Sequence, residues 1–113
     1  MDCLFCKIVC GDIPSKKVYE DEYVYAFYDI NPQAKIHVVV IPKDHIACCA
    51  DEINESNSAV IGKLFEAVPK VALAAGIEGG YRIVNNCGEN ACQSVRHIHF
   101  HILGGEKLSE TMA

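Results

Sequence analysis

Residues 97–103 read His97-Ile98-His99-Phe100-His101-Ile102-Leu103, so three of the chain's five histidines occupy alternate positions in an apolar run. Alternate side chains of a β-strand point to the same face, and the pattern therefore predicts a strand with a row of imidazoles about 6–7 Å apart. The apolar residues between them then point into a core. The alternative is a half-buried strand whose polar face happens to be histidine, but such a face needs only polar residues, not one scarce residue three times.

The composition predicts one domain over residues 1–113. Half of the residues are hydrophobic, which argues against disorder. The net charge of −5 argues against a nucleic-acid platform and against binding to an anionic membrane, because both partners require basic patches. We see no apolar signal core, and no run approaches the ~18 apolar residues of a membrane-spanning helix, so we expect a cytoplasmic protein.

The periodicity of the apolar residues predicts an α+β fold, with one short helix, one long helix and five strands in a mostly antiparallel sheet. The helices are expected near residues 4–9 and 58–75, and the strands near residues 18–19, 23–28, 37–41, 81–84 and 97–103. Pro69 lies inside the long helix, where its missing N–H predicts a kink or a restart. Gly76 is expected to end that helix.

The loop of residues 85–94 supplies amide, hydroxyl and backbone N–H donors directly before the histidine stretch. Such donors suit phosphate oxygens, and partly protonated histidines would add positive charge. An ordinary polar turn would also favour these residues. The histidines themselves allow two interpretations: a catalytic zinc with an open position, or one nucleophilic ring oriented by the others.

A wider set of segments points to a known family. The chain resembles the histidine-triad (HIT) nucleotide-binding proteins, and their Hint-like branch in particular, over residues 3–105. The resemblance is carried, in the family's order and spacing, by the histidine stretch together with Cys3-Leu4-Phe5-Cys6-Lys7-Ile8, Ala26-Phe27-Tyr28-Asp29-Ile30-Asn31-Pro32-Gln33, Val40-Ile41-Pro42-Lys43, Gln93-Ser94-Val95 and Leu103-Gly104-Gly105.

The resemblance implies a nucleotidyl hydrolase or transferase, most simply a purine nucleoside phosphoramidase that releases AMP through a nucleotidyl-histidine. His99 matches the nucleophile, between His97 and His101 of the triad, and His101 matches the contact to phosphate and leaving group. Ser94 and Asn86 match residues that hydrogen-bond phosphate oxygens, and Gln93 lies in the same loop. A nucleophilic histidine splits one displacement into two easier steps.

The nucleoside site is also implied by the resemblance. Asp29 matches the carboxylate that accepts both ribose hydroxyls, and two acceptor oxygens suit a cis-diol. The apolar walls around a purine base match Phe5, Ile8, Phe27, Tyr28 and Ile30. Plain core packing is the alternative role for these apolar residues, above all for Ile8 and Ile30.

The pair Cys3-x-x-Cys6 has a chelating spacing, although alone it fits a redox pair or two small hydrophobic residues equally well. Through the resemblance, His45 and His97 complete a four-ligand structural zinc site, with one ion per chain and no organic cofactor. The remaining cysteines are expected to be packing thiols, with Cys87 and Cys92 placed to be redox-sensitive. A sheet this small has one solvated face or edge, so we also expect a homodimer, formed by extending the sheet or by pairing helices.

Three features depart from the family's pattern. Ala91-Cys92 stand where the family usually has two glycines, the tail after Gly105 lacks a Trp-Pro-Pro ending, and Pro69 lies in the long helix. Alternative functions therefore stay open: a non-catalytic nucleotide-binding or zinc-stabilised interaction protein, a dinucleoside polyphosphate hydrolase, or an enzyme with catalytic zinc on all three histidines.

Overall fold

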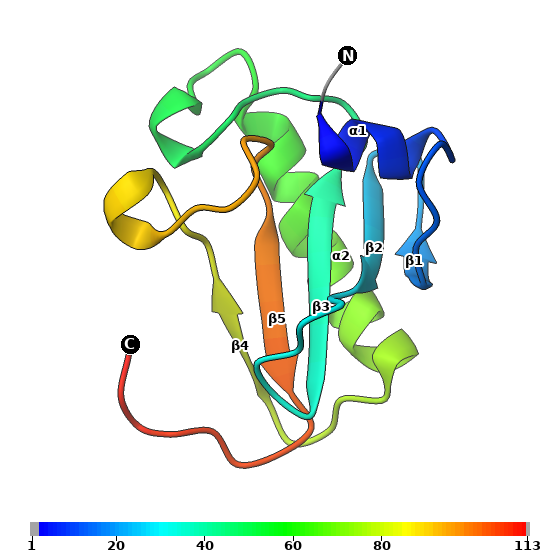
Figure 1. Ribbon diagram of the computed structural model, residues 1–113, viewed down its shortest axis with the longest axis vertical. Helices are drawn as coiled ribbons and strands as arrows, with labels where there is room; N and C mark the ends of the chain where they lie inside the picture. The colour runs from blue at the N-terminus through cyan, green and yellow to red at the C-terminus, as the bar shows by residue number, and fades with distance from the viewer. Residues whose placement is uncertain (1–2, 113) are drawn as a thin grey trace.

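The computed structural model describes residues 3–112, and its strands form one five-stranded sheet in the order β1-β2-β3-β5-β4 (Figure 1). Each strand is antiparallel to its neighbours, which confirms the predicted α+β class and sheet. The strand bounds are β1 (Lys17–Glu20), β2 (Val24–Tyr28), β3 (Ile36–Pro42), β4 (Tyr81–Val84) and β5 (Phe100–Gly104).

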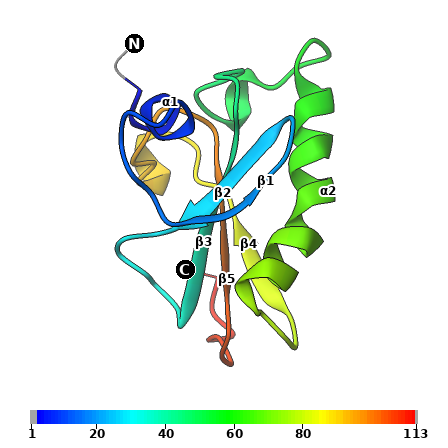
Figure 2. The ribbon, with the colours of Figure 1, turned by 90° about the vertical axis from the view of Figure 1, so that its right-hand side faces the viewer.

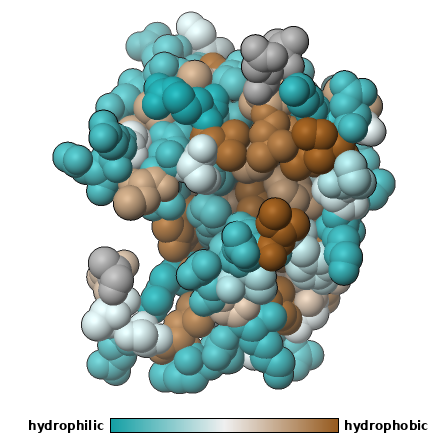
Figure 3. All heavy atoms as spheres, viewed as in Figure 1, coloured by the Kyte–Doolittle hydropathy of each residue, from teal (hydrophilic) through white to brown (hydrophobic). Residues whose placement is uncertain are grey.

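The two helices lie on opposite faces of the sheet (Figure 2). The long helix α2 (Ser58–Ala75) covers one face, where its buried residues Leu64 and Val71 pack with Phe100 and Ile102 of β5. The short helix α1 (Leu4–Val9) lies on the other face, where it contributes Phe5 to a smaller core. Apolar side chains gather around α1 on this face, as Figure 3 shows. Because the apolar residues between the histidines face α2, the histidine side chains point to the opposite face, where α1 lies.

Helix α2 follows the predicted bounds and is continuous through Pro69, so of the predicted kink or restart the restart does not occur. Pro69 is solvent-exposed, where the carbonyl that it leaves without a donor can reach water. The helix ends at Gly76, whose φ of 75° is left-handed, as the sequence predicts. Within residues 3–112, no helix is both long and apolar enough to cross a membrane.

Strand β5 begins at Phe100, three residues later than the histidine pattern predicts. Its pairing with β3 ends at Val40 opposite Phe100. Two residues further along β3 stands Pro42, which has no N–H to donate to the ladder. Ile98 instead donates its N–H to the Ala47 carbonyl at 3.0 Å. The backbone at Ile98 is thus paired with a loop rather than with the sheet.

Two short 3-10 helices, η1 (Ala50–Glu52) and η2 (Glu89–Ala91), were not expected from the sequence. Helix η2 ends at Cys92, which has φ 59° and ψ 39°, the left-handed conformation. Among the non-glycine residues in the described part of the chain, Cys92 is the one that has a positive φ. This is one of the two positions at which the family usually has glycine, and glycine adopts the left-handed conformation without steric cost.

Cys92→Gly is therefore expected to stabilise the protein by about 1 kcal/mol. A side chain in the left-handed region costs about 1–2 kcal/mol, and part of the gain from removing it is offset because glycine loses more backbone entropy on folding. The midpoint of thermal or urea unfolding measures the effect. Ala91→Gly is the matched control, since Ala91 has no positive φ and should lose stability. A Cys92→Gly protein no more stable than wild type would contradict the strain assigned to this turn.

Candidate active site and metal centre

The triad histidines form a contiguous row in front of the sheet. The rings of His99 and His101 have centroids 5.0 Å apart. His97 and His99 both pack edge-on against Phe5, at 5.8 and 5.0 Å. His97 and His99 are buried and His101 is partly exposed, so the row opens toward solvent at His101. The common face predicted from alternation is confirmed.

The hydrogen bonds of His99 define which of its nitrogens is available. Nδ1 lies 2.7 Å from the His97 carbonyl oxygen, which can only accept. Nδ1 must therefore carry the proton, and Nε2 of the neutral ring keeps its lone pair. Asn85 donates its side-chain N–H to the His99 carbonyl at 2.8 Å, which anchors the same residue from the β4 side. The sequence reasoning did not single out Asn85.

A fourth histidine, His37 on β3, joins the row and was also missed. The Gln33 backbone N–H donates to His37 Nδ1 at 3.0 Å, so His37 carries its proton on Nε2. That Nε2 lies 2.8 Å from His101 Nδ1 and 3.4 Å from an Asp29 carboxylate oxygen. His101 Nδ1 therefore accepts, and its Nε2–H is left free to donate to a ligand. The sequence feature that could have revealed His37 is its position as a histidine in an otherwise apolar, buried strand.

Burial keeps these rings neutral near pH 7. Burial, with smaller contributions from His99 and His37, lowers the pKa of His101 to about 4 against the opposing charge of Asp29. Burial also lowers the pKa of His97 to about 4, and it lowers the pKa of His99 and of His37. The partial protonation expected from the sequence is therefore wrong, because desolvation disfavours the charged ring. Of the triad rings, His101 offers a neutral Nε2–H donor to a bound phosphate.

Asp29 and His37 line a cavity of about 730 Å³ at one end of the row. Of the predicted base-binding residues, four line the same cavity: Ile8, Phe27, Tyr28 and Ile30. Ile8 and Phe27 are buried, Tyr28 is exposed, and Ile30 is 95% exposed, so Ile30 is a rim residue and not part of the core. Phe5 lies instead under the histidine rings.

The predicted phosphate-binding residues lie on the loop between β4 and β5. Gln93 holds this loop together: its side-chain N–H groups donate to the carbonyls of Cys48 (2.6 Å) and Val95 (3.0 Å), and its oxygen accepts from Gly88 N–H (2.9 Å). Its amide is thus engaged within the protein. Ser94 is solvent-exposed and Asn86 is partly exposed, so both are accessible to a ligand.

Four predicted metal ligands come together at the amino-terminal end of α1. One ligand atom each from Cys3, Cys6, His45 and His97 lies within 4.8 Å of the others. His97 Nδ1 is 3.4 Å from Cys3 Sγ and 3.6 Å from Cys6 Sγ, and His45 Nδ1 is 3.6 Å from Cys6 Sγ. Burial and the neighbouring Cys3 raise the pKa of Cys6 to about 11.

The donor set fits a tetrahedral ion. Bonds of about 2.3 Å to sulfur and 2.0 Å to nitrogen place sulfur and nitrogen ligand atoms about 3.5 Å apart, which matches the observed separations. His97 donates its Nε2–H to the Pro42 carbonyl at 2.8 Å, so its Nδ1 lone pair faces the two sulfur atoms. Such an outer hydrogen bond is typical of a metal-ligating histidine. The cluster can hold a metal ion.

Known proteins resemble this chain over most of its length. The HIT domain model matches residues 10–108 of the chain. The chain belongs to the HIT family. It is 49% identical to Protein hit of Bacillus subtilis over 105 residues, which cover 90% of this chain and 70% of that protein. It is 46% identical to the "14 kDa zinc-binding protein" of Zea mays over 108 residues, covering 94% and 84% of the two chains.

A HIT family hydrolase from Clostridium thermocellum has a solved structure that superposes with a TM-score of 0.94, at 47% identity, covering 99% of this chain and 97% of that one. The resemblance drawn from the sequence is thus confirmed for the family and for its fold.

A catalytic ion held by all three triad histidines of this HIT protein is excluded by their geometry. Within the described residues, His97 belongs to the cysteine cluster and His101 to a separate group with Asp29 and His37, whereas His99 belongs to neither. The Nδ1 of His99 is also committed to a carbonyl. The three rings therefore do not converge on one point.

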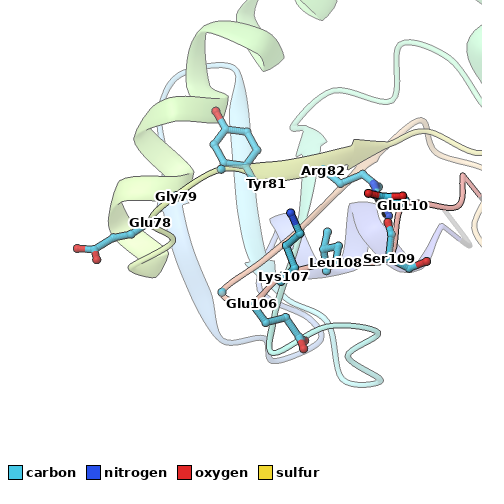
Figure 4. A pocket seen from close by; sticks show the side chains of 11 residues that line it. Glu78, Gly79, Tyr81, Arg82, Glu106, Lys107, Leu108, Ser109 and Glu110 are labelled. Carbon is cyan, nitrogen blue, oxygen red and sulfur yellow. Dashed lines mark hydrogen bonds between the residues drawn. The ribbon is translucent and has the colours of Figure 1, made fainter.

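A second hollow, of about 560 Å³, lies away from the triad, between β4 and the carboxyl-terminal tail (Figure 4). Arg82 of β4 donates to the Ser109 carbonyl at 2.7 Å and holds the tail along the strand. None of the predicted site residues lines this hollow.

Proposed function

We propose that this HIT protein is a nucleotidyl hydrolase or transferase that acts first on purine nucleoside 5′-phosphoramidates. The observation that carries the proposal is the Nε2 lone pair of His99, fixed by the 2.7 Å bond of its Nδ1 to a carbonyl. A neutral imidazole of defined tautomer is a competent nucleophile. The Clostridium thermocellum relative is described as a HIT family hydrolase, which supports a hydrolytic outcome.

In the proposed first step, His99 Nε2 forms a bond to the α-phosphorus while the phosphorus–nitrogen bond breaks. The electron pair leaves with the amine, which takes a proton from water. In the second step water attacks the phosphorus of nucleotidyl-His99, the new phosphorus–nitrogen bond breaks and the nucleoside monophosphate leaves, while the proton lost by this water neutralises the hydroxide left by the first step. The two steps together add one water to the substrate.

The other residues bind and orient. His101 is neutral and has its Nε2–H free. It therefore donates a hydrogen bond to the phosphoryl oxygens or the leaving atom and does not bring a positive charge to them. His37 sets that tautomer and is a positioning residue. Asn86 and Ser94 add neutral donors. The cavity that Asp29 lines takes the nucleoside, with the carboxylate on the ribose hydroxyls and Phe27 among the apolar walls.

A comparison of three substrates tests this proposal: an adenosine phosphoramidate, a dinucleoside tetraphosphate and a nucleotidyl sugar, each with its kcat/KM. We expect the phosphoramidate to be cleaved fastest, because its bridging nitrogen is more basic than the bridging oxygen of a phosphoanhydride and is more readily protonated as it leaves. The tetraphosphate should be slow, since its bulky anionic leaving half meets neutral histidines.

A higher kcat/KM for the tetraphosphate or the sugar nucleotide would make the phosphoramidase assignment wrong. AMP binding without turnover of any of the three would favour the non-catalytic nucleotide-binding protein.

We also propose that the four-ligand cluster takes one structural zinc ion per chain. Cys3, Cys6, His45 and His97 are thiolate and imidazole donors, which zinc prefers, and four protein ligands leave no open position for catalysis. The Zea mays relative is described as a zinc-binding protein. The ion would fasten the start of α1 to the triad.

We propose, finally, that two chains form a homodimer. β4 is an edge strand of the sheet, and its Tyr81 and Ile83 are large exposed hydrophobic residues. Edge strands with exposed apolar side chains are usually covered by a partner.

A further inference from the structure

A second group of potential metal ligands lies outside the triad and outside the Cys3 cluster. One ligand atom each from Cys49, Asp51 and Cys87 lies within 4.8 Å of the others. Cys49 immediately precedes η1, and Asp51 is the middle residue of that short helix. Cys87 comes from the loop between β4 and β5. Two loops far apart in the sequence thus bring two thiols and a carboxylate together.

Contacts between the same two loops hold this arrangement in place. Gln93 donates to the Cys48 carbonyl at 2.6 Å, directly beside Cys49. Ile98 donates to the Ala47 carbonyl at 3.0 Å on the other side of the same segment. The ligands are therefore presented by braced backbone rather than by two independent loops.

We propose that Cys49, Cys87 and Asp51 form a second metal site, which takes a thiophilic divalent ion of the zinc class through three protein ligands. In a tetrahedral site of this kind the ligand atoms are about 3.5–3.8 Å apart, so separations within 4.8 Å close with movements of about 1.3 Å or less.

The chemistry of the three donors selects the ion. Two sulfurs favour a soft or borderline metal over Mg²⁺ or Ca²⁺, and the added carboxylate favours a divalent ion over monovalent copper. Three protein ligands leave one coordination position for water. Cys49 is buried, whereas Cys87 is partly exposed and Asp51 is exposed, so an ion can enter from solvent.

Metal uptake here is linked to protons. The backbone of Asp51 lowers the pKa of Cys49, but the adjacent Cys87 thiol, burial and the Asp51 charge together raise it above its usual value. Thiols bind a metal ion as thiolates, so an ion displaces their protons when it binds. An ion would also fix Cys87, which directly follows Asn86, and so restrain the loop that carries the proposed phosphate donors.

The test uses the full chain, reduced and stripped of metal, and titrated with Cd²⁺. Thiolate-to-cadmium absorbance counts the bound equivalents, and cadmium NMR separates the two environments. We expect two ions per chain in the wild type and one in Cys87→Ala. Asp51→Asn, at an exposed position, should fold normally and weaken the second ion by at least ~10-fold, since even outer partners of metal ligands contribute that much.

Cys92→Ala is the matched control, because Cys92 lies on the same loop but outside the cluster, and it should keep both ions. One equivalent in the wild type overturns the proposal. So does a Cys87→Ala protein that keeps two equivalents, or an Asp51→Asn protein with unchanged affinity for the second ion.

Discussion

His99→Ala is expected to lower turnover of an adenosine phosphoramidate by at least ~1000-fold, or about 4 kcal/mol of transition-state stabilisation. The reason is that no neighbour can replace its free Nε2. His97 has one nitrogen on the Pro42 carbonyl and the other facing two cysteines, and His101 has its Nδ1 on His37. Single-turnover and steady-state rates with the purified variant measure the loss.

Two controls separate lost chemistry from lost structure. AMP affinity, measured by calorimetry, should stay within a few-fold of wild type, because the nucleoside cavity contains Asp29 and not His99. His99→Gly with added free imidazole should recover part of the turnover, since the small ring can supply the missing nucleophile. Near-normal steady-state rates in the alanine variant would make the nucleotidyl-histidine mechanism wrong.

The residues that the sequence predicts best are those whose role depends on local spacing. Alternation alone places the histidines on one face, and the 3.6-residue period of the apolar residues gives the bounds of α2. The metal cluster was found through the resemblance, because a Cys-x-x-Cys pair is ambiguous until the fold places His45 and His97 beside it.

Features that depend on contacts between distant segments could not be predicted. The late start of β5 follows from Pro42 of β3. Pro42 lies opposite the beginning of the histidine stretch only once β3 and β5 have paired, so the sequence of the stretch does not reveal it. The role of His37 depends on one hydrogen bond, which the backbone N–H of Gln33 donates to its Nδ1. This bond fixes the tautomer of His37 and, through it, the tautomer of His101. The protonation of the triad was predicted wrongly because it depends on burial, which one strand does not reveal.

Replacing both Cys3 and Cys6 by serine is expected to lower bound zinc from about one ion per chain to nearly none. We also expect the melting temperature to fall by about 15 °C. An ion present at about 1000 times its dissociation constant stabilises a fold by about 4 kcal/mol, and each kcal/mol is roughly 4 °C for a chain of this size. Elemental analysis and calorimetry measure the two effects.

Cys10→Ser is the matched control for this double variant. Cys10 is an exposed cysteine at the far end of the same helix, outside the cluster, so its loss should leave zinc content and melting temperature unchanged. The ion is proposed to act on the fold by tying Cys3 to His97, two residues that are 94 positions apart. Metal-free wild type should therefore melt close to the double variant. If it keeps full stability with both thiols reduced, the zinc has no structural role and α1 is held by Phe5 and its apolar neighbours alone.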